Sequence, residues 1–370
     1  MDTREFEKLL DKTTALNANN PTAEQQAICN EIQDYVFRYI PKKLFRYRRC
    51  DDYSLNAFLN DQLWFATASK MNDDYDSMLS YDKKVVENEI ANLFDKDGNI
   101  KLFIDIQNGS QYTLNILRNI VGEKELSAYV EGFRKFTAEQ IKEESDNFRN
   151  WIEQIRTNLE NEIISRLQKI VKFACFSERV DSPLMWGHYA DSSKGFAIEY
   201  DFTNGNTTEC PRCPKLGKTC FAPTNGMILH VIYANKRYDA TQVYTYILRS
   251  FLLDHLLIQR FGFVNVELKQ QLLGPIDSLL YTKIILHKAK CWEMEREWRI
   301  IYTNSYDPSF SLKDCSYVTK KPTAIYLGRK ISPAHQKFLT DVANEKGYKV
   351  FKMDVAGNSR TFTMRATPIK

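Results

Sequence analysis

Several features that would place a chain of 370 residues in a familiar class are missing from this sequence. No apolar run approaches the roughly 20 residues that cross a membrane, and the N-terminus lacks the apolar segment of a secretory signal. Eight cysteines are too few for a secreted disulfide scaffold. We therefore expect a cytoplasmic protein with reduced thiols and no membrane partner.

Nucleotide-binding signatures are also missing. The sequence has no phosphate-binding Walker loop, no dinucleotide glycine fingerprint, no internal repeat and no low-complexity tract. These absences count against a nucleoside triphosphatase and a nucleotide-fold oxidoreductase. The net charge of +4 is small beside 51 basic and 47 acidic residues, so composition does not call for a nucleic-acid or membrane partner.

Aromatic and β-branched residues are abundant, with 22 Phe, 20 Tyr and 5 Trp. Short alternating or apolar runs predict strands at residues 44–49, 63–66, 170–177, 195–201, 227–233, 323–328 and 348–353. Helical spacing predicts helices at 21–40, 53–60, 184–191, 239–259 and 332–346. This order favours an α+β fold with a mixed, largely antiparallel central sheet.

The chain divides by pattern into four parts. We expect an N-terminal helical segment at 1–43, a core formed by 44–78 and 170–370, a charged helical insertion at 79–169, and a cysteine-bearing loop at 208–222. The insertion carries an apolar stripe at helical spacing, which is typical of packing. It could serve as a lid, a dimer arm or a surface for a protein partner.

The stretch 288–302 is unusual because three glutamates alternate with large residues before an apolar run. The alternation predicts a strand with Glu293, Glu295 and Glu297 on one face. Such a row of like charges is unfavourable unless the carboxylates are solvated, paired with cations or used at a site. A solvated edge with Arg299 or a lysine as counter-ion and a functional site both remain open.

The cysteine loop has the spacing of a metal knuckle. Cys210, Cys213 and Cys220 supply three thiolates, and His230 is a candidate fourth ligand for a structural zinc ion. A reduced loop without metal is the alternative, and His230 could instead face the core from its strand.

Two further stretches contain reactive side chains. The strand at 170–177 ends in Ser177, and the helix that follows carries Trp186, His188 and Tyr189. A serine nucleophile with His188 as base lacks the strained elbow and the orienting acid of a hydrolase. The acidic turn at 73–76 resembles a magnesium site but is equally typical of a solvated loop.

Taken together, these motifs resemble the bacterial family DUF2971. The resemblance is carried by Leu44-Phe-Arg-Tyr-Arg, by Leu184-Met-Trp-Gly-His-Tyr-Ala-Asp, by Lys194-Gly-Phe-Ala-Ile-Glu-Tyr, by Trp292-Glu-Met-Glu-Arg-Glu-Trp-Arg and by Ile325-Tyr-Leu-Gly. The motifs run in order from about residue 44 to the C-terminus. This family has no assigned activity, so the resemblance implies membership only.

The order of the same elements is also similar to that of ADP-ribosyltransferases. In that family an Arg or His of the first motif holds the nicotinamide nucleotide, a Ser or Tyr element lies against nicotinamide, and a glutamate on a late strand stabilises the cationic sugar. The resemblance implies these roles for Arg46, for Ser177 and Tyr189, and for Glu295 or Glu297. The neighbouring Tyr47, Trp186 and His188 complete the expected nucleotide-binding set.

The resulting hypothesis is a bacterial effector that cleaves the nicotinamide–ribose bond of NAD and transfers ADP-ribose to a macromolecular acceptor, in phage defence or as a toxin. One alternative is a non-enzymatic protein of a defence system, either nucleic-acid-binding through the basic residues 42–49 or acting through protein interactions. A second alternative is a metal-dependent nuclease that uses Asp73, Asp74 and Asp76.

Overall fold

The computed structural model describes part of the chain and divides it into two compact units. The described residues are 3–13, 23–73, 75–76, 78, 80–93, 96–111, 113–115, 118, 126–127, 130–132, 134–203, 228–261, 273, 279–303, 315–357 and 360–369. Unit 1 comprises residues 1–78, 168–237 and 277–370, and unit 2 comprises residues 79–167 and 238–276. No described helix is long and apolar enough to cross a membrane.

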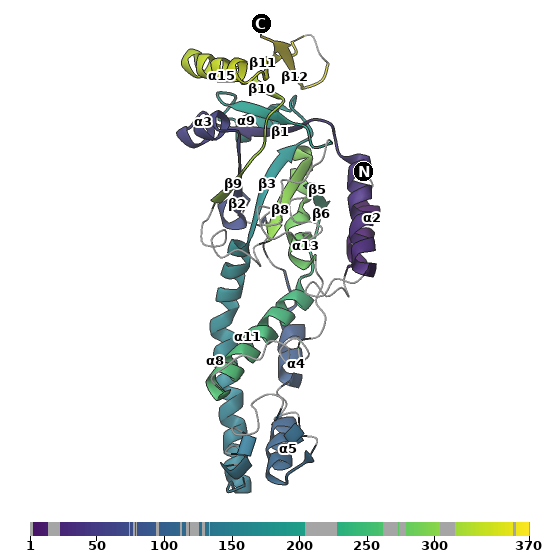
Figure 1. Ribbon diagram of the computed structural model, residues 1–370, viewed down its shortest axis with the longest axis vertical. Helices are drawn as coiled ribbons and strands as arrows, with labels where there is room; N and C mark the ends of the chain where they lie inside the picture. Colours follow the sequence, from purple (N-terminus) through teal and green to yellow (C-terminus); the bar gives the residue numbers. More distant parts are fainter. Residues whose placement is uncertain are drawn as a thin grey trace. The chain divides into compact units, whose positions relative to one another are not determined.

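Unit 1 is built on a ten-stranded sheet in the order β12-β11-β10-β4-β1-β3-β2-β9, with β8 between β3 and β5 (Figure 1). The pairs are antiparallel except for β10 with β11. The expected mixed, largely antiparallel sheet is thus confirmed. The strands are β1 (Leu44–Arg48), β2 (Gln62–Thr67), β3 (Val171–Ser177), β4 (Phe196–Tyr200), β5 (Ile228–His230), β8 (Glu297–Thr303), β9 (Cys315–Thr319), β10 (Ala324–Leu327), β11 (Lys349–Val355) and β12 (Met364–Pro368).

Strand β3 is where the sheet divides. One edge of β3 pairs with β8 along its whole length, from Val171 opposite Thr303 to Ser177 opposite Glu297. The other edge is shared, because Ser177 pairs with β1 while Lys172 and Phe173 pair with β2. Between these two pairings β1 and β2 separate, which leaves room for side chains beside the middle of β3.

The helices of unit 1 begin where the sequence supplies caps. Asp51 caps α3 (Asp52–Leu59), Ser182 caps α9 (Pro183–Tyr189) and Ser332 caps α15 (Pro333–Glu345), each by accepting a backbone N–H bond. The last two helices also begin with proline, which suits the first turn. The remaining helices are α1 (Thr3–Asp11), α2 (Ala23–Tyr39), η1 (Ala68–Lys70), α13 (Leu280–Leu286) and η2 (Lys290–Glu295). Two short strands, β6 (Ile232–Ala234) and β7 (His287–Ala289), form a separate two-stranded parallel sheet.

The apolar core of unit 1 lies against the sheet. It contains buried side chains from α1, α2, β1, β3, β4, β8, β10 and α15, including Phe6, Ile32, Phe173, Phe196, Trp298, Ile300, Ile325 and Leu339. Burying an aromatic or aliphatic side chain stabilises the fold by about 1.5–3 kcal/mol. This core therefore fixes the backbone of β1, β3 and β8, on which the polar residues of the next section stand.

Unit 2 is helical and contains α4 (Lys83–Leu93), α5 (Lys96–Gln107), most of α8 (Ala138–Ile170) and α11 (Thr241–Phe261). Tyr81 stacks on Tyr244 with ring centroids 3.9 Å apart. The backbone N–H of Asp82 donates to the Thr241 hydroxyl, 2.8 Å away. Residues just before α4 are in this way tied to the first turn of α11.

The strand predicted for the glutamate-rich stretch is wrong over residues 290–296. Residues 290–295 form the 3-10 helix η2, Arg296 follows it in a left-handed conformation with φ of 44°, and β8 begins only at Glu297. The consequence is that Glu293 is exposed while Glu295 and Glu297 are both buried. Alternation alone could not reveal this turn, since Arg is not a residue that favours positive φ.

Candidate functional site

A cavity of about 250 Å³ opens in unit 1 beside the divided edge of β3. Its wall takes side chains from β1, β3, α9, β7, η2, β8 and the turn that follows η1. Six of the residues proposed from the sequence line this cavity: Arg46, Tyr47, Ser177, Tyr189, Glu295 and Glu297. The structure therefore brings together segments separated by up to 250 positions in the chain.

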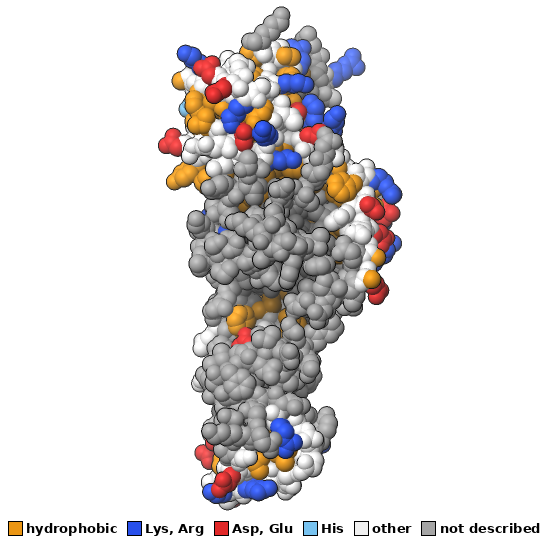
Figure 2. Space-filling model, in the orientation of Figure 1, with side chains coloured by type: hydrophobic (Ala, Val, Ile, Leu, Met, Phe, Trp, Pro, Cys, Tyr) orange, Lys and Arg blue, Asp and Glu red, His pale blue; other side chains and the backbone are white. Residues whose placement is uncertain are grey.

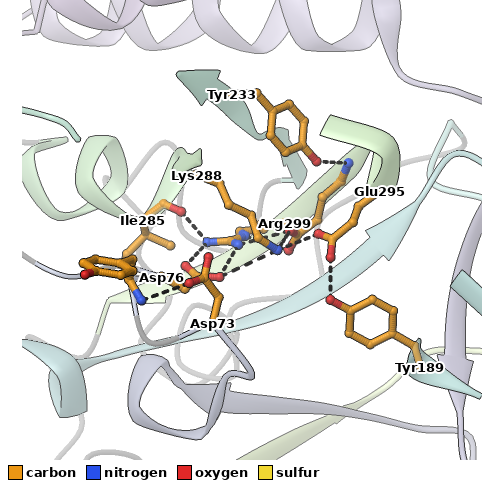
Figure 3. Close-up of polar contacts among 10 residues, drawn as sticks. Asp73, Asp76, Tyr189, Tyr233, Ile285, Lys288, Glu295 and Arg299 are labelled. Atoms are coloured by element: carbon orange, nitrogen blue, oxygen red, sulfur yellow. Dashed lines mark hydrogen bonds and ion pairs between the residues drawn. The ribbon is translucent and has the colours of Figure 1, made fainter. Parts of the chain in front are cut away.

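One end of the cavity holds a buried cluster of charges (Figure 3). Lys288 donates to Glu295 Oε2 at 2.5 Å and to Glu297 Oε2 at 3.0 Å. Arg299 forms two bonds to Glu297, at 2.7 and 3.1 Å, and two to Asp76, at 2.8 and 2.6 Å. All five side chains are buried, so each charge depends on the others for its stability.

The count of charges in this cluster is uneven. Asp76, Glu295 and Glu297 are three carboxylates, whereas Lys288 and Arg299 are two cations. Arg299 is bonded to Asp76 and Glu297, whereas Lys288 is bonded to both glutamates and also lies 4.0 Å from Asp76 Oδ2. Glu295 is therefore the carboxylate with the weakest compensation.

Because the two glutamates are compensated unequally, their pKa values shift in opposite directions. Burial and the charge of Glu297 raise the pKa of Glu295, against the opposing effect of Lys288. Burial would also raise the pKa of Glu297, but the charges of Arg299 and Lys288 outweigh it and hold this pKa below the ordinary value. Two carboxylates whose environments separate their pKa values are typical of acid–base sites.

Tyr189 and Tyr233 orient this pair. The Tyr189 hydroxyl, from the end of α9, donates to Glu295 Oε1, and burial followed by the charge of Glu295 raises the pKa of the phenol (Figure 3). The backbone N–H of Glu297 donates to the Tyr233 hydroxyl, 2.8 Å away. Tyr189 thus contacts the carboxyl group of Glu295, whereas Tyr233 contacts the backbone of Glu297.

Arg46 is the cation at the β1 side of the cavity. Its Nη2 donates to the Trp64 carbonyl at 2.6 Å, and its guanidinium lies 5.7 Å from the centroid of the Phe176 ring. Among the described residues no carboxylate pairs with it, and its Nη1 has no hydrogen-bond partner. Burial, and then the charge of Arg48, lower the pKa of Arg46 to about 9, so it remains a cation at neutral pH.

Other predicted residues have different surroundings. The Ser177 hydroxyl donates to the Glu295 carbonyl at 2.6 Å, so it positions the backbone of η2 rather than pairing with His188. Trp186 is fully buried, and its indole N–H donates to the Val180 carbonyl at 2.7 Å. His188 is exposed, with its ring 6.5 Å from that of Trp292. Trp186 and His188 do not line the cavity.

Of the four proposed zinc ligands, the structure describes only His230. Cys210, Cys213 and Cys220 lie outside the described residues. His230 is described, and its ring packs edge-on against Trp298 with centroids 5.2 Å apart, while burial lowers its pKa. No group of three metal-ligating side chains occurs within the described ranges. Zinc in the cysteine loop stays a prediction.

The sequence does not group Lys288, Asp76 and Tyr233 with the glutamates. Lys288 lies in the glutamate-rich stretch, where a lysine is a candidate counter-ion, but nothing in the pattern predicts its burial. Asp76 is suggested by the sequence only as a magnesium ligand. Its distance of 223 positions from Arg299 hides this contact from any local pattern.

The comparison with known families bears on this part of the chain. Residues 185–300 match the model of a family described as "Protein of unknown function (DUF2971)". This family model covers about a third of the chain, and in this region the chain resembles DUF2971. The matched region contains most of α9 and the first four residues of β8, and it includes Tyr189, Lys288, both buried glutamates and Arg299. No curated protein and no solved structure matches this chain, so the resemblance to ADP-ribosyltransferases stays a hypothesis.

Proposed function

We propose that this protein cleaves the nicotinamide–ribose bond of NAD and passes ADP-ribose to water or to a macromolecular acceptor. The observation that carries the proposal is the undercompensated carboxylate of Glu295 in a cavity that also contains the buried cation of Arg46. NAD combines a cationic nicotinamide ring with an anionic pyrophosphate, so these two groups match the charges of Glu295 and Arg46.

The reaction needs negative charge where Glu295 lies. As the bond breaks, nicotinamide leaves with the bonding electron pair and the ribose develops oxocarbenium character. A fixed carboxylate in a buried site stabilises that developing charge far more than it would in water. Glu295 is suited to this because Lys288, its only cation partner in the cluster, is shared with Glu297.

Completion of the reaction needs a base. Water or an acceptor hydroxyl adds to the ribose carbon and must lose its proton. The raised pKa of Glu295 makes its carboxylate a stronger base than that of an ordinary glutamate, which suits it to take this proton. Glu297, held ionised by Arg299 and Lys288, keeps these two cations in position.

Arg46 supports binding of the anionic end. A buried guanidinium without a carboxylate partner is unfavourable, and a ligand phosphate would supply the missing charge through an unused N–H group. Tyr47 and Cys175 also line the cavity. Burial raises the pKa of the Cys175 thiol, which makes it a poor nucleophile.

The alternatives receive less support from the contacts. Both oxygens of Asp76 accept bonds from Arg299, so they are already engaged and do not favour a magnesium site; Asp74 lies outside the described residues. Of the basic residues near β1, Lys43 pairs with Glu199 at 3.1 Å. Lys, Arg, Asp and Glu side chains are interspersed over the part of unit 1 that contains α15 on the face shown in Figure 2. A role in phage defence or as a toxin, and a protein partner for the helical unit, remain hypotheses based on family analogy.

The test is release of nicotinamide from NAD by the purified full-length chain, with and without a cell extract. We expect release in both cases if water can act as acceptor, and release with transfer of labelled ADP-ribose to a macromolecule if an acceptor is required. If a folded protein releases no nicotinamide under either condition, the proposal is wrong. The ion cluster then has a purely structural role.

A further inference from the structure

Two polar atoms in the cavity wall have no hydrogen-bond partner among the described residues. One is Nη1 of Arg46, whose side chain is 9% exposed, and the other is Oδ2 of Asp73. Both residues line the cavity. The wall therefore contains one unused donor on β1 and one unused acceptor in the turn after η1.

Asp73 is held in place by its other oxygen. Oδ1 accepts a bond from the backbone N–H of Tyr75 at 3.0 Å, which is the local turn that aspartate commonly makes with the residue two positions later (Figure 3). Oδ2 is left buried without a partner. Burying an unpaired carboxylate oxygen costs free energy, so such an atom in a cavity calls for a ligand that donates to it.

The other charged groups of the cavity wall narrow the chemistry of that donor. Arg46, Arg48, Lys70 and Lys288 line the same cavity, so a cationic ligand group in it would meet like charges. A hydroxyl is a neutral donor, and a carboxylate that accepts from a sugar hydroxyl is a frequent means of recognising ribose. Arg46 in turn suits a phosphate.

We propose that Asp73 binds a ribose hydroxyl of a nucleotide whose phosphate is bound by Arg46. This inference rests on the proposed function, and it adds that the ligand must carry free ribose hydroxyls. A cavity of about 250 Å³ is slightly smaller than the roughly 300–1,000 Å³ of ligand pockets in general, which favours a nucleoside 5′-phosphate portion over a complete dinucleotide.

The experiment compares binding of AMP and of 2′,3′-dideoxy-AMP by calorimetry or ligand-observed NMR, so that it needs no turnover. The full-length chain should bind AMP about tenfold or more tightly than the dideoxy analogue, because a hydrogen bond to a charged group is lost. Asp73→Ala should abolish this preference. Asp73→Asn, which retains a neutral acceptor oxygen, should keep part of it.

Asp201→Ala is the matched control. Asp201 lies outside the cavity wall and makes the same kind of local turn, accepting from the N–H of Thr203 at 2.8 Å. It should leave the preference for AMP unchanged. Equal affinity of the unmodified chain for the two nucleotides, failure to bind AMP, or a preference that survives Asp73→Ala would each overturn the inference. If AMP is preferred through Asp73 but NAD is not cleaved, the proposed reaction fails while the role of Asp73 stands.

Discussion

At the scale of single residues, the two buried glutamates have different tasks although they are two positions apart. Glu297 is bonded to both cations of the cluster, whereas Glu295 shares one cation and accepts from Tyr189. The glutamates themselves could be singled out from the sequence because their alternation with large residues is rare. Their unequal environments could not, because these depend on Asp76 and Arg299 meeting across 223 positions.

Replacing the two glutamates should therefore affect stability differently. We expect Glu297→Gln to lower the free energy of unfolding by about 3–5 kcal/mol, because it leaves buried cations without their partner. Glu295→Gln should cost much less, since it removes the surplus charge of the cluster. Denaturant unfolding of both variants checks this, and a Glu295→Gln variant as unstable as Glu297→Gln would contradict the uneven distribution of charge.

We expect Glu295 to contribute to the dependence of the free energy of unfolding on pH. Its pKa in the folded chain is raised above the ordinary value of 4.5 by burial and by Glu297. The folded state thus binds more protons than the unfolded chain from about pH 4.5 upward, and the contribution of Glu295 to stability falls as the pH rises through that range. The opposite holds for Glu297, whose lowered pKa gives a contribution that is present above pH 4.5 and lost on further acidification.

Unfolding free energies of the unmodified chain and of Glu295→Gln, measured between about pH 4.5 and neutrality, separate the two effects. As the pH rises, the unfolding free energy of the unmodified chain should fall relative to that of Glu295→Gln. A difference that is constant with pH would show that the pKa of Glu295 is the same in the folded and unfolded states.

At the scale of elements, most strands and helices of unit 1 could be predicted because their apolar residues recur at the period of two or of 3.6. The failure at residues 290–296 has a local cause. Arg296 adopts φ of 44°, which joins η2 to β8 and turns both Glu295 and Glu297 toward Lys288. A glycine or asparagine would have signalled this turn, and arginine does not.

The structure explains why two positions of the sequence motifs, Gly195 and Gly328, are occupied by glycine. A Cβ at Gly195 would overlap the carbonyl oxygen of Arg48, and a Cβ at Gly328 would overlap that of Ser193. The backbone N–H of Gly328 also donates to the Gly195 carbonyl at 2.9 Å. Close approach of backbones at the ends of β1, β4 and β10 therefore requires glycine at both positions.

We expect Gly195→Ala to destabilise the chain by about 1–3 kcal/mol or more, because the new methyl group meets backbone that cannot move aside. Gly187→Ala is the matched control. Gly187 lies in α9 with no atom within 4 Å of an added Cβ, so alanine should raise stability by about 0.5–1 kcal/mol. Thermal or denaturant unfolding distinguishes the two, and equal effects would contradict the close approach.

At the scale of the whole molecule, every residue of the candidate site belongs to unit 1. The site is assembled from the segments 45–48, 66–76, 173–189 and 288–299, and only the order of the motifs, through their likeness to known families, suggested that these segments meet. Physical reasoning on local patterns could not bring them together, because the contacts between them depend on how the sheet divides at β3. The role of the helical unit stays a hypothesis.

The central claim is that Glu295 acts on a bound NAD molecule, and the rate of nicotinamide release tests it most directly. The full-length chain should release nicotinamide from NAD, and Glu295→Gln should lower the rate about a hundredfold or more while remaining folded. Tyr189→Phe, which removes only the hydrogen bond to Glu295, should lower the rate less. Unchanged release in folded Glu295→Gln, or no release by the unmodified chain with any acceptor, would contradict the account.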